Sequence, residues 1–96
     1  MNIVENLLQS LQEECAEIVV AASKANRFGL ADRYPEHTCP STQEKLVGEV
    51  HDLMGVLELL QEQGIIPKEF DRAKIEAKKE KVARYQRYSR ATKTLT

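Results

Sequence analysis

NIVENLLQSLQEECAEIVVAASKAN, residues 2–26, is the stretch that decides the fold. Its apolar residues recur at intervals of three and four, which is the spacing of one face of an α-helix. Asn2 followed by Glu5 has the form of a capping box at a helix start. We therefore expect a long amphipathic helix from about residue 3 to about residue 26, ending before Gly29.

The sequence that follows predicts a loop and two more helices. Residues 29–41 contain glycine, prolines and other turn formers, and a loop of this length in so small a domain is often functional. Ser41 and Glu44 make a second capping box ahead of a helical apolar stripe, for which Gly64 is a good terminator. Pro67 suits the first turn of a third helix, which should fray before the end of the chain.

Length and composition narrow the class of protein. We expect residues 1–96 to form a single all-α domain, an antiparallel helical bundle. A chain this short buries a modest share of its surface, so we expect a homodimer or homotetramer to complete the bundle. The first residues do not resemble a signal peptide and no stretch is long enough for a membrane span, which favours a cytoplasmic protein with no membrane partner.

The charges are distributed unevenly. Residues 1–66 carry 4 Lys or Arg and 11 Asp or Glu, a balance of −7. Residues 67–96 carry 10 Lys or Arg and 4 Asp or Glu, a balance of +6. Two interpretations are open. The third helix is simply a solvated basic helix, or the protein has a site in which acidic residues hold cations and basic residues bind a polyanion.

Some of the acids lie where apolar residues are expected. At about 100° per residue, and with Leu53 at the centre of the stripe, Glu49 falls at about −40° and Asp52 at about −100°. The same projection of the first helix puts Glu14 about 60° and Glu17 about 120° from the centre of its apolar face. A carboxylate inside a core stripe is costly unless it is paired or binds a metal.

Each of these two helices therefore offers a carboxylate pair one turn apart. If the helices pack antiparallel, the pairs can converge, and four like charges brought together repel unless a cation lies between them. Oxygen ligands favour Mg²⁺, with Mn²⁺ as a close substitute. The alternative is that the acids of the first helix form a solvated face and that Glu49 pairs with a lysine.

The spacing of the acids also resembles a family signature. They form EExxE on the first helix and ExxD on the second, at Glu13, Glu14, Glu17, Glu49 and Asp52. This pattern is similar to that of the MazG-like, all-α nucleoside triphosphate pyrophosphohydrolases, and the likeness covers residues 5–62 well and the third helix only loosely. The 31 residues between the two motifs are a longer gap than the family usually has, and His51 stands where related sequences often carry something smaller.

The resemblance implies an activity and a set of ligands. It implies Mg²⁺-dependent hydrolysis of nucleoside triphosphates, with deoxynucleoside triphosphates favoured, to a nucleoside monophosphate and pyrophosphate. A housecleaning role in the nucleotide pool would fit that activity. The implied metal ligands are Glu14, Glu17, Glu49 and Asp52. Glu13 is left with three open roles: orienting a ligand, helping to activate water, or lying solvated.

A triphosphate also needs cations beyond the metal. Lys24 and Arg27 on the first helix, and Lys78 and Lys81 on the third, are the candidates to neutralise it. Tyr85 lies beside the third-helix lysines and could stack on the base. For any one of these lysines, the alternative is an ordinary solvated surface position.

Three rival interpretations are weaker. His51-Asp52 would suit an HD-type phosphohydrolase, but His37 is the only other histidine. A zinc site that combined these two histidines with Cys15 and Cys39 would draw two ligands from the loop. A non-enzymatic helical interaction module with a basic, nucleic-acid-binding third helix is permitted by the +6 balance, but it leaves the position of Glu49 unexplained.

Overall fold

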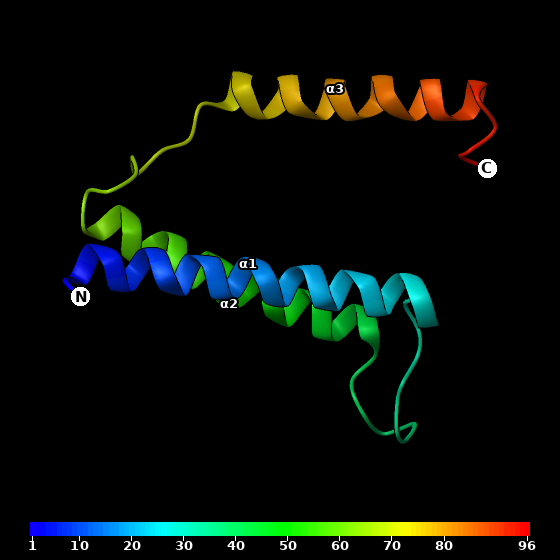
Figure 1. The fold of residues 1–96 in the computed structure, drawn as a ribbon, viewed down its shortest axis with the longest axis horizontal. Coiled ribbons are helices and arrows are strands. Elements are labelled where there is room, and N and C mark those ends of the chain that lie inside the picture. Colours follow the sequence, from blue (N-terminus) through cyan, green and yellow to red (C-terminus); the bar gives the residue numbers. More distant parts are fainter.

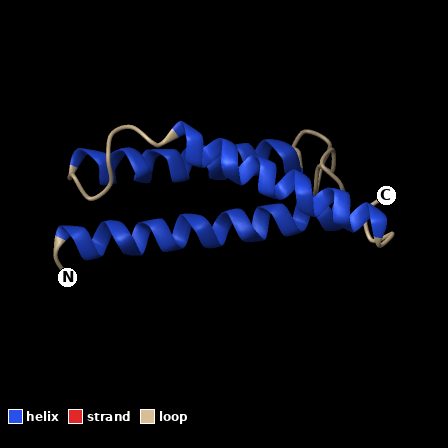
Figure 2. Ribbon diagram, turned by 90° about the horizontal axis from the view of Figure 1, so that it is seen from above, coloured by secondary structure: helices blue, strands red, loops and turns tan.

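The chain forms three helices and no strand. The computed structural model describes residues 1–96 and contains α1 (Ile3–Phe28), α2 (Thr42–Glu62) and α3 (Arg72–Ala91), as Figures 1 and 2 show. None of these helices combines the length and the apolar composition that a membrane crossing requires. The predicted all-α class is confirmed.

The ends of α1 are set by local signals. The backbone N–H of Glu5 donates to the Asn2 side chain at 2.8 Å, and the Asn2 amide donates back to the Glu5 carboxylate at 2.9 Å. The helix continues two residues beyond the predicted end, to Phe28. It stops at Gly29, whose φ of 91° suits a residue without a Cβ.

The predicted ends of α2 are also confirmed. The Ser41 hydroxyl accepts a hydrogen bond from the Glu44 N–H at 3.1 Å. At the other end, Gly64 has a φ of 72°, and its N–H and that of Ile65 bond back to the carbonyls of Gln61 and Leu60, both at 3.0 Å. This pair of bonds is the Schellman motif, which a glycine at this position favours.

The predicted start of α3 is wrong. The sequence placed it at Pro67, but the helix begins at Arg72. The Asp71 carboxylate caps the first turn by accepting two backbone N–H groups, at 2.9 and 3.3 Å. The Gln61 side chain meanwhile donates to the carbonyl oxygens of Pro67 and the next residue, at 3.2 and 3.1 Å, which holds this segment as a non-helical connection.

Packing involves α1 and α2 alone. They lie side by side and antiparallel, and α3 contacts neither of them, so that it runs apart from the hairpin in Figure 1. The buried apolar residues, Leu7, Ala25 and Leu60, all belong to the hairpin. Only 5 of the 96 residues are buried, so a single chain has a very small core. The α1–α2 hairpin is therefore the unit that positions the candidate site.

Candidate metal centre and adjoining pocket

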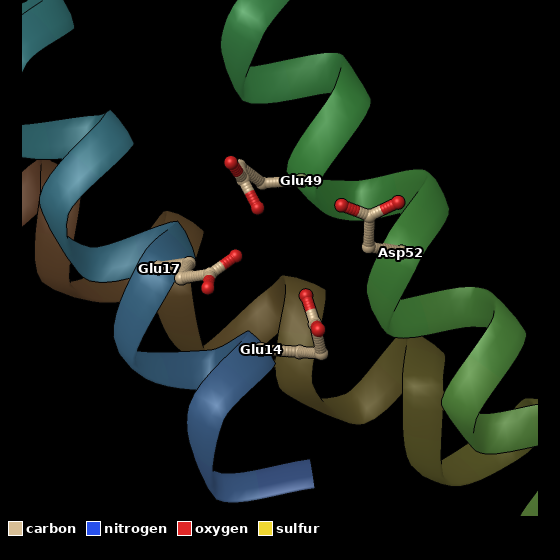
Figure 3. Close-up of side chains that lie close together, drawn as sticks. All are labelled: Glu14, Glu17, Glu49 and Asp52. Atoms are coloured by element: carbon tan, nitrogen blue, oxygen red, sulfur yellow. The ribbon is translucent and has the colours of Figure 1, made fainter. Parts of the chain in front are cut away.

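Four carboxylates converge between α1 and α2. Glu14 and Glu17 project from α1, and Glu49 and Asp52 project from α2, as Figure 3 shows. One oxygen from each of the four lies within 4.8 Å of the others. The antiparallel hairpin thus brings together the four residues that the resemblance implied as ligands.

Burial divides these carboxylates into two kinds. Glu14 and Glu49 are half-buried, whereas Glu17 and Asp52 are exposed. This order follows the helix projection, in which Glu14 and Glu49 lay nearer the apolar stripes. One oxygen of Glu14 and one of Glu49 (Oε2 in each) are buried and have no hydrogen-bond partner. Because a buried acceptor without a donor is costly, these two atoms are well suited to a cation.

Glu49 does not pair with a lysine in the structure, in contrast to the alternative left open by the sequence. The ion pairs of the chain join Arg33 to Glu44, and other cations to acids within α3. Glu49 takes part in none of them, and its buried oxygen has no partner.

The proximity of the acids raises two pKa values. Burial raises the pKa of the Glu14 carboxyl, and the charges of Glu17, Asp52 and Glu13 raise it further. A side-chain hydrogen bond with Glu17 raises the pKa of Glu49, and burial and the neighbouring charges add to the effect. Both shifts favour the protonated carboxyl, whereas a bound cation would favour the ionised ligand, so metal binding at this cluster would be coupled to proton release.

Glu13 lies outside this group of four. It is exposed on α1, and its effect on the cluster is that of a nearby negative charge on Glu14. Its role in catalysis stays a prediction.

A pocket of about 740 Å³ adjoins the carboxylates. Glu17 and Glu49 belong to both the cluster and the pocket wall. From there the pocket extends along the C-terminal half of α1 and the N-terminal half of α2 to the loop that joins them.

Chemically different side chains follow one another along this pocket. On α1 the order is Glu17, Lys24 and Phe28, which at 1.5 Å per residue spans roughly 16 Å. On α2, which runs the other way, Lys45 follows Glu49 toward the loop. On both helices an acid is thus followed by a lysine in the same direction, and on α1 an aromatic ring comes next.

The loop 29–41 closes the far end of the pocket with Asp32 and Tyr34. Its first residues are fastened to the start of α2: the Thr42 N–H donates to the Asp32 carbonyl at 2.9 Å, and the Thr42 hydroxyl donates to the Gly29 carbonyl. The Arg33 guanidinium fastens its second half, donating to the Cys39 carbonyl and to the Glu44 carboxylate, both at 2.7 Å. The loop is thus a wall of defined shape.

The substrate-binding residues expected from the sequence are not all brought together. Lys24 lines the pocket, but Arg27 does not, and its guanidinium lies over the Phe28 ring at 5.7 Å. Lys78, Lys81 and Tyr85 lie on α3, which contacts neither helix of the hairpin. Within one chain they are therefore separate from the carboxylates, and their role in substrate binding stays a prediction.

Sequence reasoning missed other pocket residues. Lys45 lies one turn before Glu49, so helical spacing alone could have found it. Phe28 lies one turn after Lys24 and could have been found in the same way. Asp32 and Tyr34 could not, because their place depends on contacts between the loop and α2.

The rival metal sites gain no support from the geometry. The four acids form the one group of potential ligands in the chain, and it includes no histidine or cysteine. His51 and Cys15 are both exposed.

Comparison with known proteins leaves the resemblance resting on its motifs. No protein-family model, no curated protein and no solved structure matches the chain.

Proposed function

We propose that this protein is a Mg²⁺-dependent hydrolase that converts nucleoside triphosphates to nucleoside monophosphate and pyrophosphate. The observation that carries the proposal is the four-carboxylate cluster, with its two buried oxygens that lack any partner. Clustered acids whose pKa values are raised by burial and by their neighbours are typical of a functional site. The reaction class and the preference for deoxynucleotides rest on the family resemblance.

The residues that would hold the metal are Glu14, Glu17, Glu49 and Asp52. An all-oxygen set suits Mg²⁺, with Mn²⁺ as a substitute. When bound, the ion supplies charge neutralisation for the phosphates and lowers the pKa of a coordinated water. The half-buried Glu14 and Glu49 fix the depth of the site, and the exposed Glu17 and Asp52 leave it open on the solvent side.

The pocket supports a polyphosphate substrate. Lys24 and Lys45 line the pocket from opposite helices, on the loop side of Glu17 and Glu49, and neither is in an ion pair. Two ammonium groups on either side of a phosphate chain would offset its charge and hold it in line with the carboxylates.

We also propose that the working enzyme is a homodimer or homotetramer. A core of so few residues leaves large apolar side chains exposed on the hairpin, such as Val19 and Met54. The α3 helix has 8 Lys or Arg and 2 Glu and contacts nothing in its own chain. The α3 helix of a second copy could pack on the acidic hairpin and bring Lys78, Lys81 and Tyr85 to the site. Light scattering tests the assembly, and a monomer at all concentrations would count against it.

Product analysis tests the reaction. A deoxynucleoside triphosphate with Mg²⁺ should yield the monophosphate and intact pyrophosphate. In ¹⁸O-labelled water, attack at the α-phosphorus puts the label in the monophosphate. Inorganic phosphate with a diphosphate product would show cleavage at the γ position, and label confined to pyrophosphate would show attack at the β-phosphorus. Glu49→Gln should abolish turnover, whereas Glu58→Gln, the same change on the exposed side of α2, should not.

One observation favours a second candidate, a nucleic-acid-binding helical module. Lys78 and Lys81 are left without an acidic partner on an isolated basic helix, because the ion pairs of α3 use other cations. Such a module would bind DNA or RNA without Mg²⁺, and its affinity would fall steeply with salt. A metal-dependent loss of triphosphate would favour the hydrolase instead.

A further inference from the structure

The end of the pocket farthest from the acidic cluster is not used by the metal chemistry. It contains two aromatic rings, Phe28 and Tyr34, and one carboxylate, Asp32. Apart from Glu17 and Glu49, Asp32 is the only acid that lines the pocket. A site for phosphate alone would need neither the rings nor a further negative charge.

The backbone of Asp32 is fixed, and its side chain is free to bind. The Asp32 N–H donates to the Gly29 carbonyl at 3.3 Å, and the Asp32 carbonyl accepts from the Thr42 N–H at 2.9 Å. The chain's ion pairs involve other acids, and the carboxylate of Asp32 makes no hydrogen bond within the chain. Asp32 is thus a half-buried residue at the pocket wall whose carboxylate has no partner within the chain.

The order of side chains along the pocket sets the direction of a bound nucleotide. Phosphates belong beside the carboxylate cluster and the two lysines, because only these groups supply or recruit positive charge. The sugar and base then extend toward the loop. Nucleobases bind to proteins by stacking on aromatic side chains and by hydrogen bonds along their Watson–Crick edges. Phe28 and Tyr34 are two such aromatic side chains in the pocket wall, and Asp32 is a carboxylate in the same wall that could accept hydrogen bonds from a base.

We propose that the Phe28–Tyr34–Asp32 end of the pocket is a nucleobase subsite that selects guanine. This inference rests on the proposed function for its substrate class. A carboxylate offers two adjacent acceptors and no donor. Guanine presents two adjacent N–H donors, N1–H and the N2 amino group. Adenine, cytosine and thymine each place an acceptor next to a donor, which would set that acceptor against the negative charge of Asp32.

Binding of non-hydrolysable α,β-methylene triphosphates, measured by calorimetry with Mg²⁺, tests the subsite without turnover. The guanine analogue should bind at least about 10-fold more tightly than the hypoxanthine analogue, which lacks the N2 amino group, because a hydrogen bond to a charged group is lost. Asp32→Asn presents one acceptor and one donor, the arrangement that adenine matches, so it should reverse the preference of guanine over adenine. Glu36→Gln, an exposed change in the same loop, should leave the ranking as it is. Tyr34→Ala should weaken all bases together, by roughly 5- to 100-fold for a lost stacking contact.

The outcomes separate this inference from the proposed function. Equal binding of all bases, a ranking that Asp32→Asn does not change, or no binding of any analogue would overturn the subsite. Guanine-selective binding that depends on Asp32, with no release of pyrophosphate from dGTP, would overturn the hydrolase and leave the subsite standing. Release of pyrophosphate at the same kcat/KM from all four deoxynucleotides would overturn the guanine subsite and leave the hydrolase standing.

Discussion

Replacing Glu49 by glutamine should have opposite effects on stability with and without Mg²⁺. In the metal-free protein, the substitution removes one charge from four acids whose ligand oxygens lie within 4.8 Å of one another. The introduced side chain also brings an amide donor to a place where a buried oxygen lacks a partner. We therefore expect the metal-free variant to melt at a higher temperature than the metal-free wild type.

The pH dependence of this difference follows from the raised pKa values. Because the pKa values of Glu14 and Glu49 lie above the ordinary 4.5, the folded protein binds these protons more tightly than the unfolded chain. The resulting stabilisation is fully present below pH 4.5 and is lost as the pH rises through the raised values. The advantage of the glutamine variant should thus be small below pH 4.5 and should grow as the pH rises through the raised pKa values.

Mg²⁺ should reverse the order of the two proteins. A ligand that binds only the folded state at about ten times its Kd stabilises it by about 1.4 kcal/mol, and for a domain of this size that raises Tm by roughly 6–11 °C. Wild type should gain this shift, and Glu49→Gln only a fraction of it. Glu58→Gln should behave as wild type. Scanning calorimetry in EDTA and in Mg²⁺ checks all three proteins, and equal Mg²⁺ shifts for wild type and Glu49→Gln would refute the metal-ligand assignment.

Three further predictions concern protons, phosphate and the core. Mg²⁺ binding should release protons just above pH 4.5 and release fewer as the pH rises through the raised pKa values of Glu14 and Glu49, which calorimetry in buffers of different ionisation enthalpy measures; proton release that does not change with pH would contradict it. Lys24→Ala should lower kcat/KM for a triphosphate roughly 10- to 100-fold through a lost charge-assisted contact, against no change for the α3 variant Lys74→Ala. Leu60→Ala, at a side chain 1% exposed, should destabilise the fold by about 2–5 kcal/mol in urea, and Leu59→Ala, at 47% exposed, by much less.

The parts of the fold that could be predicted are those fixed within one turn of helix. Caps at Asn2, Ser41 and Gly64 act through hydrogen bonds between residues at most five positions apart, so short sequence patterns suffice. The carboxylate cluster could be predicted for a related reason. An i, i+3 pair on each of two helices needs only an antiparallel hairpin to converge, and α1 and α2 pack in that way.

The other features depend on competition between alternative helix starts or on tertiary contacts. Pro67 and Asp71 both suit the start of a helix. No sequence pattern predicts that the Gln61 side chain binds the carbonyl oxygens near Pro67, which leaves Asp71 as the cap. The far wall of the pocket depends on hydrogen bonds between residues 29–32 and the first residues of α2, for which no periodic pattern exists. The position of α3 was not predictable either, because its weak apolar stripe specifies no partner within the chain.

That open position of α3 leads to a test of whether the site is shared between subunits. Suppose that a site combines the α1–α2 hairpin of one copy with Lys78 and Lys81 of another. Glu49→Gln should then be inactive, and the double variant Lys78→Ala, Lys81→Ala should be strongly impaired. In a mixed dimer of the two, the intact hairpin of the lysine variant meets the intact α3 of the Glu49→Gln copy, and one site of two is restored. Random mixing should thus recover about a quarter of wild-type activity, since about half of the dimers are mixed.

If each site instead uses its own α3, neither site of a mixed dimer is complete, and mixing should recover nothing. A lysine double variant with full activity would remove α3 from the site altogether, and would leave Lys24 and Lys45 as its cations.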